Sequence, residues 1–276
     1  MVSKAKIKEI QSLGIKKFRD EKNIFVAEGD KLVGCLLPSF ACECLIATAR
    51  WIDKQGVITA SSHTFAQQDR TDKDCLLSQG AVTVKELIIA KEDEIQKAGF
   101  LKTPHDVLAV FRKPCYAIDE ANPASQLILA LDGIQDPGNL GTIIRLAEWF
   151  GIEHIICSRD TADAFSPKTV QATMGALANV KIHYTNLEEY ITVNPSIPIY
   201  GTFLNGENIY ESVLSQQGII VMGNEGNGIR LEIEPLINKR LYIPSYHPDR
   251  LTTGSLNVAT ATDIVCAAFR LLRSYQ

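Results

Sequence analysis

The stretch DGIQDPGNLGTIIRLAEWFG, residues 132–151, decides the fold of this chain. It follows the continuous apolar run Leu127–Leu131, which is typical of a strand buried on both faces of a parallel sheet. Similar runs predict further strands at residues 154–157, 197–203, 218–222 and 241–243, with helical segments between most of them. This alternation predicts an α/β fold with a mostly parallel sheet.

The turn inside this stretch brings polar side chains to the edge of the sheet where ligands usually bind. Pro137 restricts the residue before it to an extended conformation, and Gly138 tolerates a tight turn. We therefore expect Asn139 at the helix N-cap. At about 100° per residue, Arg145 points away from the core stripe. Two structural alternatives stay open, a plain cap for Asn139 and a surface pair of Arg145 with Glu148. The expected core stripe is Ile143, Leu146, Ala147 and Phe150.

A glycine-rich loop follows a later strand, in VMGNEGNGI at residues 221–229. Three glycines in six residues suggest that backbone approaches a ligand there, although an ordinary tight turn is the alternative. The spacing matches neither a Walker loop nor a dinucleotide fingerprint. Glu225 lies inside the loop, where its carboxylate needs a partner or solvent.

The last helix opens in GSLNVA, residues 254–259, where Ser255 is the expected N-cap. Its apolar residues follow two lines, which indicates a helix that is buried or lies at a subunit interface. We take this as support for a dimer. The two lines are Val258, Ala261, Val265, Ala268 and Leu272, and Ile264, Ala267 and Leu271.

The first hundred or so residues predict a smaller α/β unit. Its expected strands are 24–29, 44–48 and 107–111, and its expected helices are 31–37 and 92–99. A segment rich in proline and small polar residues, 113–125, is the expected linker. Residues 1–23 carry seven basic and three acidic side chains, which indicates either an RNA-binding face or a solvated helix face.

Composition limits the possible function classes. The chain has 276 residues, 46% of them hydrophobic, and a net charge of −4, which argues against a nonspecific nucleic-acid coat. No apolar run approaches the roughly 20 residues of a membrane span. The first residues lack an apolar signal region, so we expect a cytoplasmic protein. Seven scattered cysteines without zinc-like spacing predict reduced thiols and no metal site.

Taken together, the three segments resemble the SpoU/TrmH branch of the SPOUT RNA ribose 2′-O-methyltransferases. Asn139, with Arg145 six residues on, matches the first signature of that family, and Gly223–Gly228 is similar to its Gly-x-Glu-Gly-x-Gly signature. Ile243 and Pro244, followed by Ser255–Asn257, resemble the third. The likeness covers roughly residues 127–272, and residues 1–112 more weakly resemble a ribosomal-protein-like RNA-binding domain.

This resemblance implies a trefoil-knotted sheet that binds S-adenosylmethionine. It also implies a homodimer that methylates RNA, with ribosomal RNA as the expected substrate. The implied domains are 1–112 for RNA binding, 113–125 as linker and 126–276 for methyl transfer. Implied cofactor contacts are Thr202, Gly223, Ile243 and Leu256, and implied catalytic residues are Asn139, Arg145, Glu225, Ser255 and Asn257. Lys16, Lys17 and Arg19 are the implied RNA contacts.

The proposed chemistry suits these residue types. A sulfonium methyl is already activated, so the enzyme must chiefly align a ribose 2′-hydroxyl and help to remove its proton. Arg145 is a poor base at its ordinary pKa, and we expect it to contact the hydroxyl and the adjacent phosphate. The segment 245–254 is longer than the family's usual one and lines the expected cofactor pocket; its His247 and Arg250 are candidates for polar contacts there.

Two other function classes stay open. The first is a noncatalytic RNA-binding or ribosome-assembly protein, which the altered segment 245–254 would suit. The second is a nucleotide-binding α/β enzyme of unrelated chemistry, which the missing phosphate-loop spacing disfavours. Asn139, Arg145, Glu225, Ser255 and Asn257 favour the methyltransferase over both.

Overall fold

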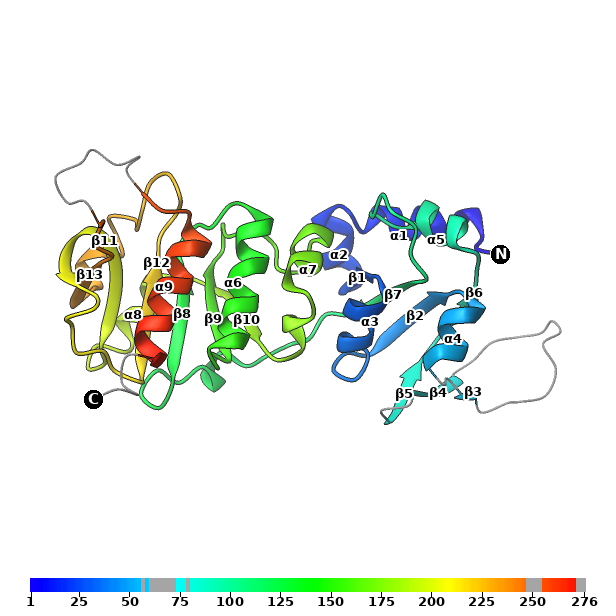
Figure 1. Cartoon of the computed structure of the whole chain (residues 1–276), viewed down its shortest axis with the longest axis horizontal. Coiled ribbons are helices and arrows are strands. Elements are labelled where there is room, and N and C mark those ends of the chain that lie inside the picture. Colours follow the sequence, from blue (N-terminus) through cyan, green and yellow to red (C-terminus); the bar gives the residue numbers. More distant parts are fainter. Residues whose placement is uncertain (56–57, 60–72, 78–79, 247–254, 272–276) are drawn as a thin grey trace. The chain divides into compact units, whose positions relative to one another are not determined.

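The chain forms two compact units in a computed structural model (Figure 1). The first contains Met1–Cys115 and Phe165–Ala178, and the second contains Tyr116–Ala164 and Asn179–Gln276. The structure describes residues 1–55, 58–59, 73–77, 80–246 and 255–271.

A six-stranded sheet forms the centre of the second unit. The strand order is β10-β9-β8-β12-β11-β13, and every neighbouring pair is parallel. All residues of β8, β9 and β12 are buried, as continuous apolar runs predict for central strands. The strands are β8 Leu127–Leu131, β9 His154–Ser158, β10 Lys181–Thr185, β11 Ile199–Asn208, β12 Gly218–Met222 and β13 Lys239–Tyr242.

Two long helices, α6 (Pro137–Trp149) and α9 (Val258–Leu271), lie side by side over the sheet of this unit (Figure 1). On α6, Ile143 and Ala147 are buried as expected, but Leu146 and Phe150 are only half-buried. Leu140 and Ile144 are buried in addition, so the core face is broader than the predicted stripe. Shorter elements are α8 Leu187–Thr192 and the 3-10 turns η1 Ile118–Glu120 and η3 Glu234–Leu236.

The first unit is built on a mixed sheet with the order β1-β7-β2-β5-β4-β3, and β6 also pairs with β2. β7 is antiparallel to both β1 and β2, whereas β5 and β6 run parallel to β2. The strands are β1 Ile24–Glu28, β2 Cys42–Ala47, β3 Ile58–Thr59, β4 Lys73–Leu77, β5 Gly80–Val84, β6 Leu87–Ile89 and β7 Val107–Arg112.

Alternation along β1 and β7 gives this sheet two apolar faces. On one face, Val26 and Leu108 pack with Ile10 of α1 and Ile95 of α5, two helices that lie side by side (Figure 1). On the other face, the Phe25 ring is surrounded by three phenylalanines, Phe40, Phe111 and Phe165. The helices are α1 Lys4–Ser12, α2 Lys16–Lys22, α3 Asp30–Leu36, α4 Ala49–Gln55, α5 Glu92–Ala98 and α7 Pro167–Thr173, with the 3-10 turn η2 Ala176–Ala178.

The predicted strands and helices of both units are confirmed, with ends that shift by a few residues. The largest difference is β11, which continues to Asn208 through a register shift between Thr202 and Glu207. Within the part of the chain described here, no helix is long and apolar enough to cross a membrane.

Candidate active site

The predicted site residues gather at one edge of the parallel sheet. β8 ends at Leu131 and β12 at Met222, and these strands are neighbours in parallel register. Their carboxyl ends therefore lie together, and each is followed by a polar loop. Residues 132–136 lead from β8 into α6, and residues 223–230 follow β12.

Asp136, and not Asn139, caps α6. Asp136 has an extended backbone, its side chain accepts the N–H of Asn139 at 2.9 Å, and Pro137 occupies the first helical turn. This corrects the predicted N-cap by three residues. The signal was present in the sequence, because an acidic residue before proline is a common helix start. With Asp136 as the cap, the side chain of Asn139 is available for another contact.

That contact is with Glu225 of the glycine-rich loop. Asn139 Nδ2 donates to Glu225 Oε1 at 2.8 Å, and Asn257 Nδ2 donates to Asn139 Oδ1 at 3.1 Å. The loop after β12, the first turn of α6 and the start of α9 are thus joined by three side chains. All three were predicted as catalytic residues from sequence, and the structure brings them together.

The donors and acceptors in these two side-chain hydrogen bonds can be assigned from chemistry. Asn257 Oδ1 accepts the backbone N–H groups of Ala259 and Thr260, so the amide nitrogen of Asn257 must face Asn139. Asn139 then presents its oxygen to Asn257 and its nitrogen to Glu225. An ionised carboxylate only accepts, so it fits the last position. Glu225, Asn139 and Asn257 are therefore held in one orientation.

The same contacts correct the start of α9. Ser255 was expected to cap this helix, but α9 begins at Val258 and the capping oxygen belongs to Asn257. Ser255 lies two residues earlier with an exposed side chain. Its hydroxyl therefore contributes nothing to the cap, and its predicted catalytic role stays a prediction.

The glycine-rich loop closes tightly on itself. Asn224 and Gly228 exchange backbone hydrogen bonds, each 2.9 Å long. A Cβ at Gly223 would lie 2.3 Å from the carbonyl carbon of Gly228 and 2.4 Å from the nitrogen of Ile229. Only glycine fits at that position, because both obstacles are backbone atoms. Asn224 also donates to the Gly133 carbonyl at 2.7 Å, which links the loop to the end of β8.

Asp132 and Arg230 hold the far end of this loop, and sequence reasoning missed both. Asp132 is fully buried at the end of β8, and its carboxylate accepts the backbone N–H of Arg230 at 2.8 Å and Arg230 Nε at 2.6 Å. Asp160 lies 3.6 Å from the same guanidinium. An acidic residue directly after a buried strand, and a basic one directly after the glycine loop, were the available signals.

Arg145 is exposed on α6, on the side away from the core as predicted. Among the described residues, no hydrogen bond or ion pair involves its guanidinium. The alternative pair with Glu148 is not formed, because Glu148 instead accepts from Asn179 Nδ2 at 2.6 Å. Arg145 is therefore available to an incoming anionic group.

Two known protein families match this sequence. The SpoU rRNA Methylase family model matches residues 126–267, and an MRM3-like substrate binding domain matches residues 4–109. The chain belongs to the SpoU rRNA methylase family. In this family it is 29% identical to a Bacillus subtilis 23S rRNA (guanosine(2553)-2′-O)-methyltransferase, RlmP, over 94% of each chain.

Two solved structures are similar over almost the whole chain. A Porphyromonas gingivalis protein assigned to the TrmH family of RNA methyltransferases is 37% identical, covers 98% of each chain and has a TM-score of 0.79. An AdoMet-bound rRNA methyltransferase from Sinorhizobium meliloti is 27% identical, with a TM-score of 0.77, and covers 98% of this chain and 96% of its own.

A SpoU methylase needs a cofactor site, and the residues predicted for it fit one. Three of them are half-buried on neighbouring parallel strands: Thr202 lies in β11 at its register shift, and Gly223 and Ile243 directly follow β12 and β13. Leu256 is 50% exposed, and covering such a side chain with an apolar ring is favourable. All four are uncharged, as the adenosine part of S-adenosylmethionine requires. His247 and Arg250 lie outside the described residues.

The predicted RNA contacts of the first unit differ in exposure. Lys16 and Lys17 are exposed on α2, and Lys17 lies 3.9 Å from Glu21. Arg19 is only 3% exposed and donates to the Leu13 carbonyl at 2.6 Å. Arg19 therefore holds the turn between α1 and α2, and Lys16 and Lys17 stay the candidates for contact with RNA. Over the described ranges, no cluster of three or more side chains suited to a metal was found.

Proposed function

We propose that this protein transfers a methyl group from S-adenosylmethionine to a ribose 2′-hydroxyl of ribosomal RNA. The observation that carries the proposal is the Glu225–Asn139–Asn257 chain at the edge of a parallel sheet, in a member of the SpoU rRNA methylase family. The related RlmP is named for this reaction on 23S rRNA, and the related S. meliloti enzyme binds AdoMet. The intact chain of side chains favours catalysis over the noncatalytic alternative.

When bound, S-adenosylmethionine supplies a methyl group that is already activated by its positive sulfur. The residues of this chain must then hold the ribose in line and exclude competing orientations, and such alignment can contribute several kcal/mol, on the order of 7 in favourable cases. Asn139 is fixed between Glu225 and Asn257, so its position costs little reorganisation when RNA arrives. Ser255 is exposed two residues before Asn257, and in this proposal it supplies a further hydroxyl.

Arg145 contacts the 2′-hydroxyl and the adjacent phosphate in this proposal. Its guanidinium has five N–H donors, a positive charge and, among the described side chains, no competing carboxylate. Charge-assisted hydrogen bonds to phosphate fix the ribose, and the nearby positive charge favours loss of the hydroxyl proton. Arg145 acts as the base itself only in the assembled complex, because a guanidinium does not give up its proton on its own.

The direct test incubates the purified protein with isotopically labelled S-adenosylmethionine and ribosomal RNA. A ribose 2′-O-methyl group blocks cleavage of the next phosphodiester by alkali, so label in alkali-resistant dinucleotides identifies the reaction. Label in alkali-labile mononucleotides would instead show base methylation. No transfer to ribosomal RNA from cells that lack the protein would contradict the proposal.

Arg145→Ala tests the assigned role of the arginine. We expect turnover to fall at least about a hundredfold while cofactor binding, measured by calorimetric titration, is unchanged. Lys239→Ala is the matched control. Lys239 is an exposed cation at the start of β13, whereas the site lies at the carboxyl ends of the strands. Near-normal turnover of Arg145→Ala with RNA binding intact would remove Arg145 from the mechanism.

The homodimer, the cytoplasmic location and the trefoil knot also belong to this proposal. Apolar side chains on the outside of α6 and α9 support the dimer: Trp149 is 83% exposed and Leu271 is 55% exposed. Arg270 donates to the carbonyls of Phe150 and Gly151, so the ends of both helices are tied together. A second copy of the chain is the occupant we propose for this surface.

A ribosomal RNA substrate supports the cytoplasmic location, and membership of the SpoU family supports the trefoil knot.

A further inference from the structure

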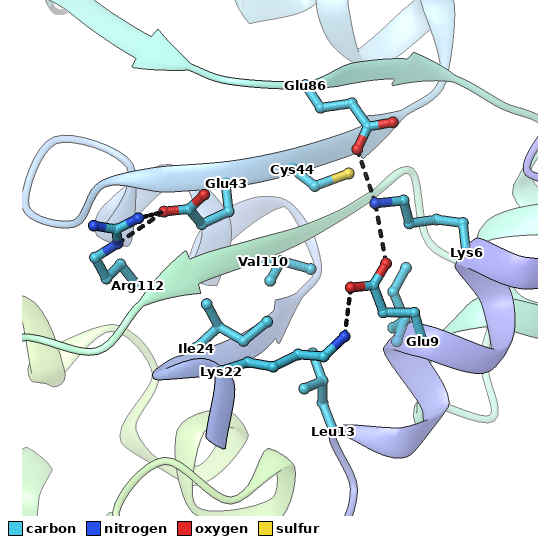
Figure 2. A pocket seen from close by; sticks show the side chains of 11 residues that line it. Lys6, Glu9, Leu13, Lys22, Ile24, Glu43, Cys44, Glu86, Val110 and Arg112 are labelled. Atoms are coloured by element: carbon cyan, nitrogen blue, oxygen red, sulfur yellow. Dashed lines mark hydrogen bonds and ion pairs between the residues drawn. The ribbon is translucent and has the colours of Figure 1, made fainter. Parts of the chain in front are cut away.

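The first unit contains a pocket of about 320 Å³ that the proposed reaction does not use (Figure 2). Helices α1 and α2 form one wall, and strands β1, β2 and β7 form the other (Figure 2). The volume lies at the lower end of the range for small-molecule sites, and it is large enough for one planar ring system of one or two fused rings. The lining residues are Lys6, Glu9, Ile10, Leu13, Lys22, Ile24, Glu43, Cys44, Glu86, Val110 and Arg112.

The polar lining of this pocket is electrically balanced. It contains three basic and three acidic side chains, and each of them is paired within the unit. Lys6 Nζ lies between two carboxylates, 3.2 Å from Glu9 and 2.8 Å from Glu86 (Figure 2). A free phosphate or a metal ion would meet charges of both signs. The balance therefore favours a neutral occupant that carries both donors and acceptors.

The remaining lining is apolar. Ile10, Leu13 and Val110 are buried, and Ile24 is half-buried at the wall of the pocket. Cys44 is also uncharged, because burial raises the pKa of its thiol to about 12. An aliphatic wall with a polar rim suits a flat ring whose polar groups lie on its edge.

We propose that this pocket binds one unpaired base of the RNA substrate, and that guanine is the base it prefers. The inference rests on the proposed function, since it takes the ligand to be part of the RNA that is methylated. Independent support comes from the match of residues 4–109 to a substrate binding domain, because that range includes most of the pocket. Sequence-specific RNA recognition commonly uses unpaired bases that enter protein pockets.

The choice of guanine follows from the neighbouring groups Glu86 and Lys6. Among the described residues, Glu9 and Glu43 each pair with two cations, whereas Glu86 pairs with one cation, Lys6, and with the Cys44 thiol, which is a weak donor. Glu86 therefore keeps the largest unused capacity to accept hydrogen bonds. Guanine alone among the RNA bases has two adjacent N–H donor groups next to a carbonyl oxygen. The carboxylate accepts from N1 and N2 of the base, and the Lys6 ammonium donates to its O6.

The test measures binding of short oligouridines that carry one guanine, inosine or adenine at the centre. Fluorescence anisotropy of labelled RNA with the full-length protein gives each dissociation constant. We expect guanine to bind about tenfold more tightly than adenine. Inosine should lie between them, because it keeps the O6 oxygen and N1–H but lacks the 2-amino group.

Two variants and one control locate the preference. Glu86→Gln and Lys22→Gln should each reduce the guanine preference at least about threefold, the first by removing the acceptor and the second by freeing Glu9 to compete for Lys6. Lys97→Gln is the control, because Lys97 pairs with Asp93 on the same unit but does not line the pocket. Thermal unfolding of each variant verifies that the first unit remains folded.

Equal affinity of the wild type for all three RNAs overturns the inference, as does an unchanged preference in both variants. The methylation assay separates this result from the proposed function. A wild type that methylates ribosomal RNA without a base preference overturns only the guanine pocket. A wild type that prefers guanine but transfers no methyl group overturns only the proposed reaction.

Discussion

Glu225 is the last acceptor of the Asn257–Asn139–Glu225 hydrogen bonds, and a carboxylate suits this position because it only accepts. Glutamine at this position would present an amide that both donates and accepts. The glutamine oxygen would accept from Asn139 without the charge of the carboxylate, so the contact that holds Asn139 would be weakened. Because each of these side chains is only half-buried or exposed, we expect the fold to survive the change.

Glu225→Gln should lower turnover by about tenfold to a hundredfold, since an interaction worth roughly 1.5–3 kcal/mol is weakened. Single-turnover methyl transfer at saturating cofactor measures this step directly. Glu153→Gln replaces an exposed carboxylate at another position of the same unit and should leave turnover unchanged. Equal rates for the wild type and Glu225→Gln would mean that the chain of side chains only stabilises the fold.

At the residue scale, sequence reasoning misplaced two helix caps next to the predicted site. Asn139 was expected as a cap, yet it contributes to the site because Asp136 takes that position. Ser255 was expected to cap α9, yet Asn257 caps it. Both errors are shifts of two or three residues among residue types that all cap helices well. The Asp132–Arg230 contact joins residues 98 positions apart, and no local pattern predicts such a partner.

At the scale of elements, two glycines of the glycine-rich loop differ in the space that they leave for a Cβ atom. Gly223→Ala forces a methyl group to within 2.4 Å of backbone atoms of Gly228 and Ile229, so the loop must open. At Gly226 a Cβ would meet only the side-chain oxygen of Asn224, at 3.5 Å. We expect Gly223→Ala to abolish saturable S-adenosylmethionine binding in calorimetric titration and Gly226→Ala to retain it. Similar binding by both variants would exclude the loop from the cofactor site.

Strands β9 and β10 contain a buried histidine pair with a predictable pH response. His154 Nδ1 and His183 Nε2 lie 3.0 Å apart, and their rings stack. Burial, followed by the charge of Lys181, lowers the pKa of His154. Burial, followed by the effect of His154, lowers the pKa of His183 to about 4. Both rings are therefore neutral in the folded protein at pH 7.

A lowered folded-state pKa gives stability that is complete above about pH 6.5 and is lost as the pH falls towards 4. The unfolded chain takes up protons in this window that the folded chain excludes. Urea unfolding between pH 7 and 4.5 should show a loss of up to about 3 kcal/mol from this pair. In the double variant His154→Gln/His183→Gln that share of the pH dependence should disappear; identical slopes for both proteins would refute the assignment.

The central strands were predictable because each leaves a local signal, whereas the edge strand β10, with its polar residues, was not predicted. Leu127–Leu131 and Gly218–Met222 are continuous apolar runs, and both are central strands. The register shift in β11 between Thr202 and Glu207 has no comparable signal, because it depends on pairing with β13. Strand order is likewise non-local, and the sequence alone indicated parallel pairing without the order.

For the whole molecule, the exposed ends of α6 and α9 predict association. Replacing Leu271 with glutamate puts a charge on a surface that we expect to be desolvated in a dimer, and this is costly. Leu271→Glu should shift sedimentation from dimer to monomer. Val193→Glu is the control, since Val193 is 74% exposed at the end of α8. A wild type that sediments as a monomer would contradict the dimer at once.

The segment Phe165–Ala178 has a consequence for how the protein is made. It belongs to the first unit, where Phe165 packs 5.0 Å from Phe25, yet it follows β8 and β9 of the second. On a ribosome, the aromatic face around Phe25 must wait for some 140 further residues before its last ring is synthesised. The first unit therefore cannot finish folding before the second has begun, and a fragment cut at residue 112 would expose part of that face. The order of the segments along the chain therefore couples the folding of the two units during synthesis.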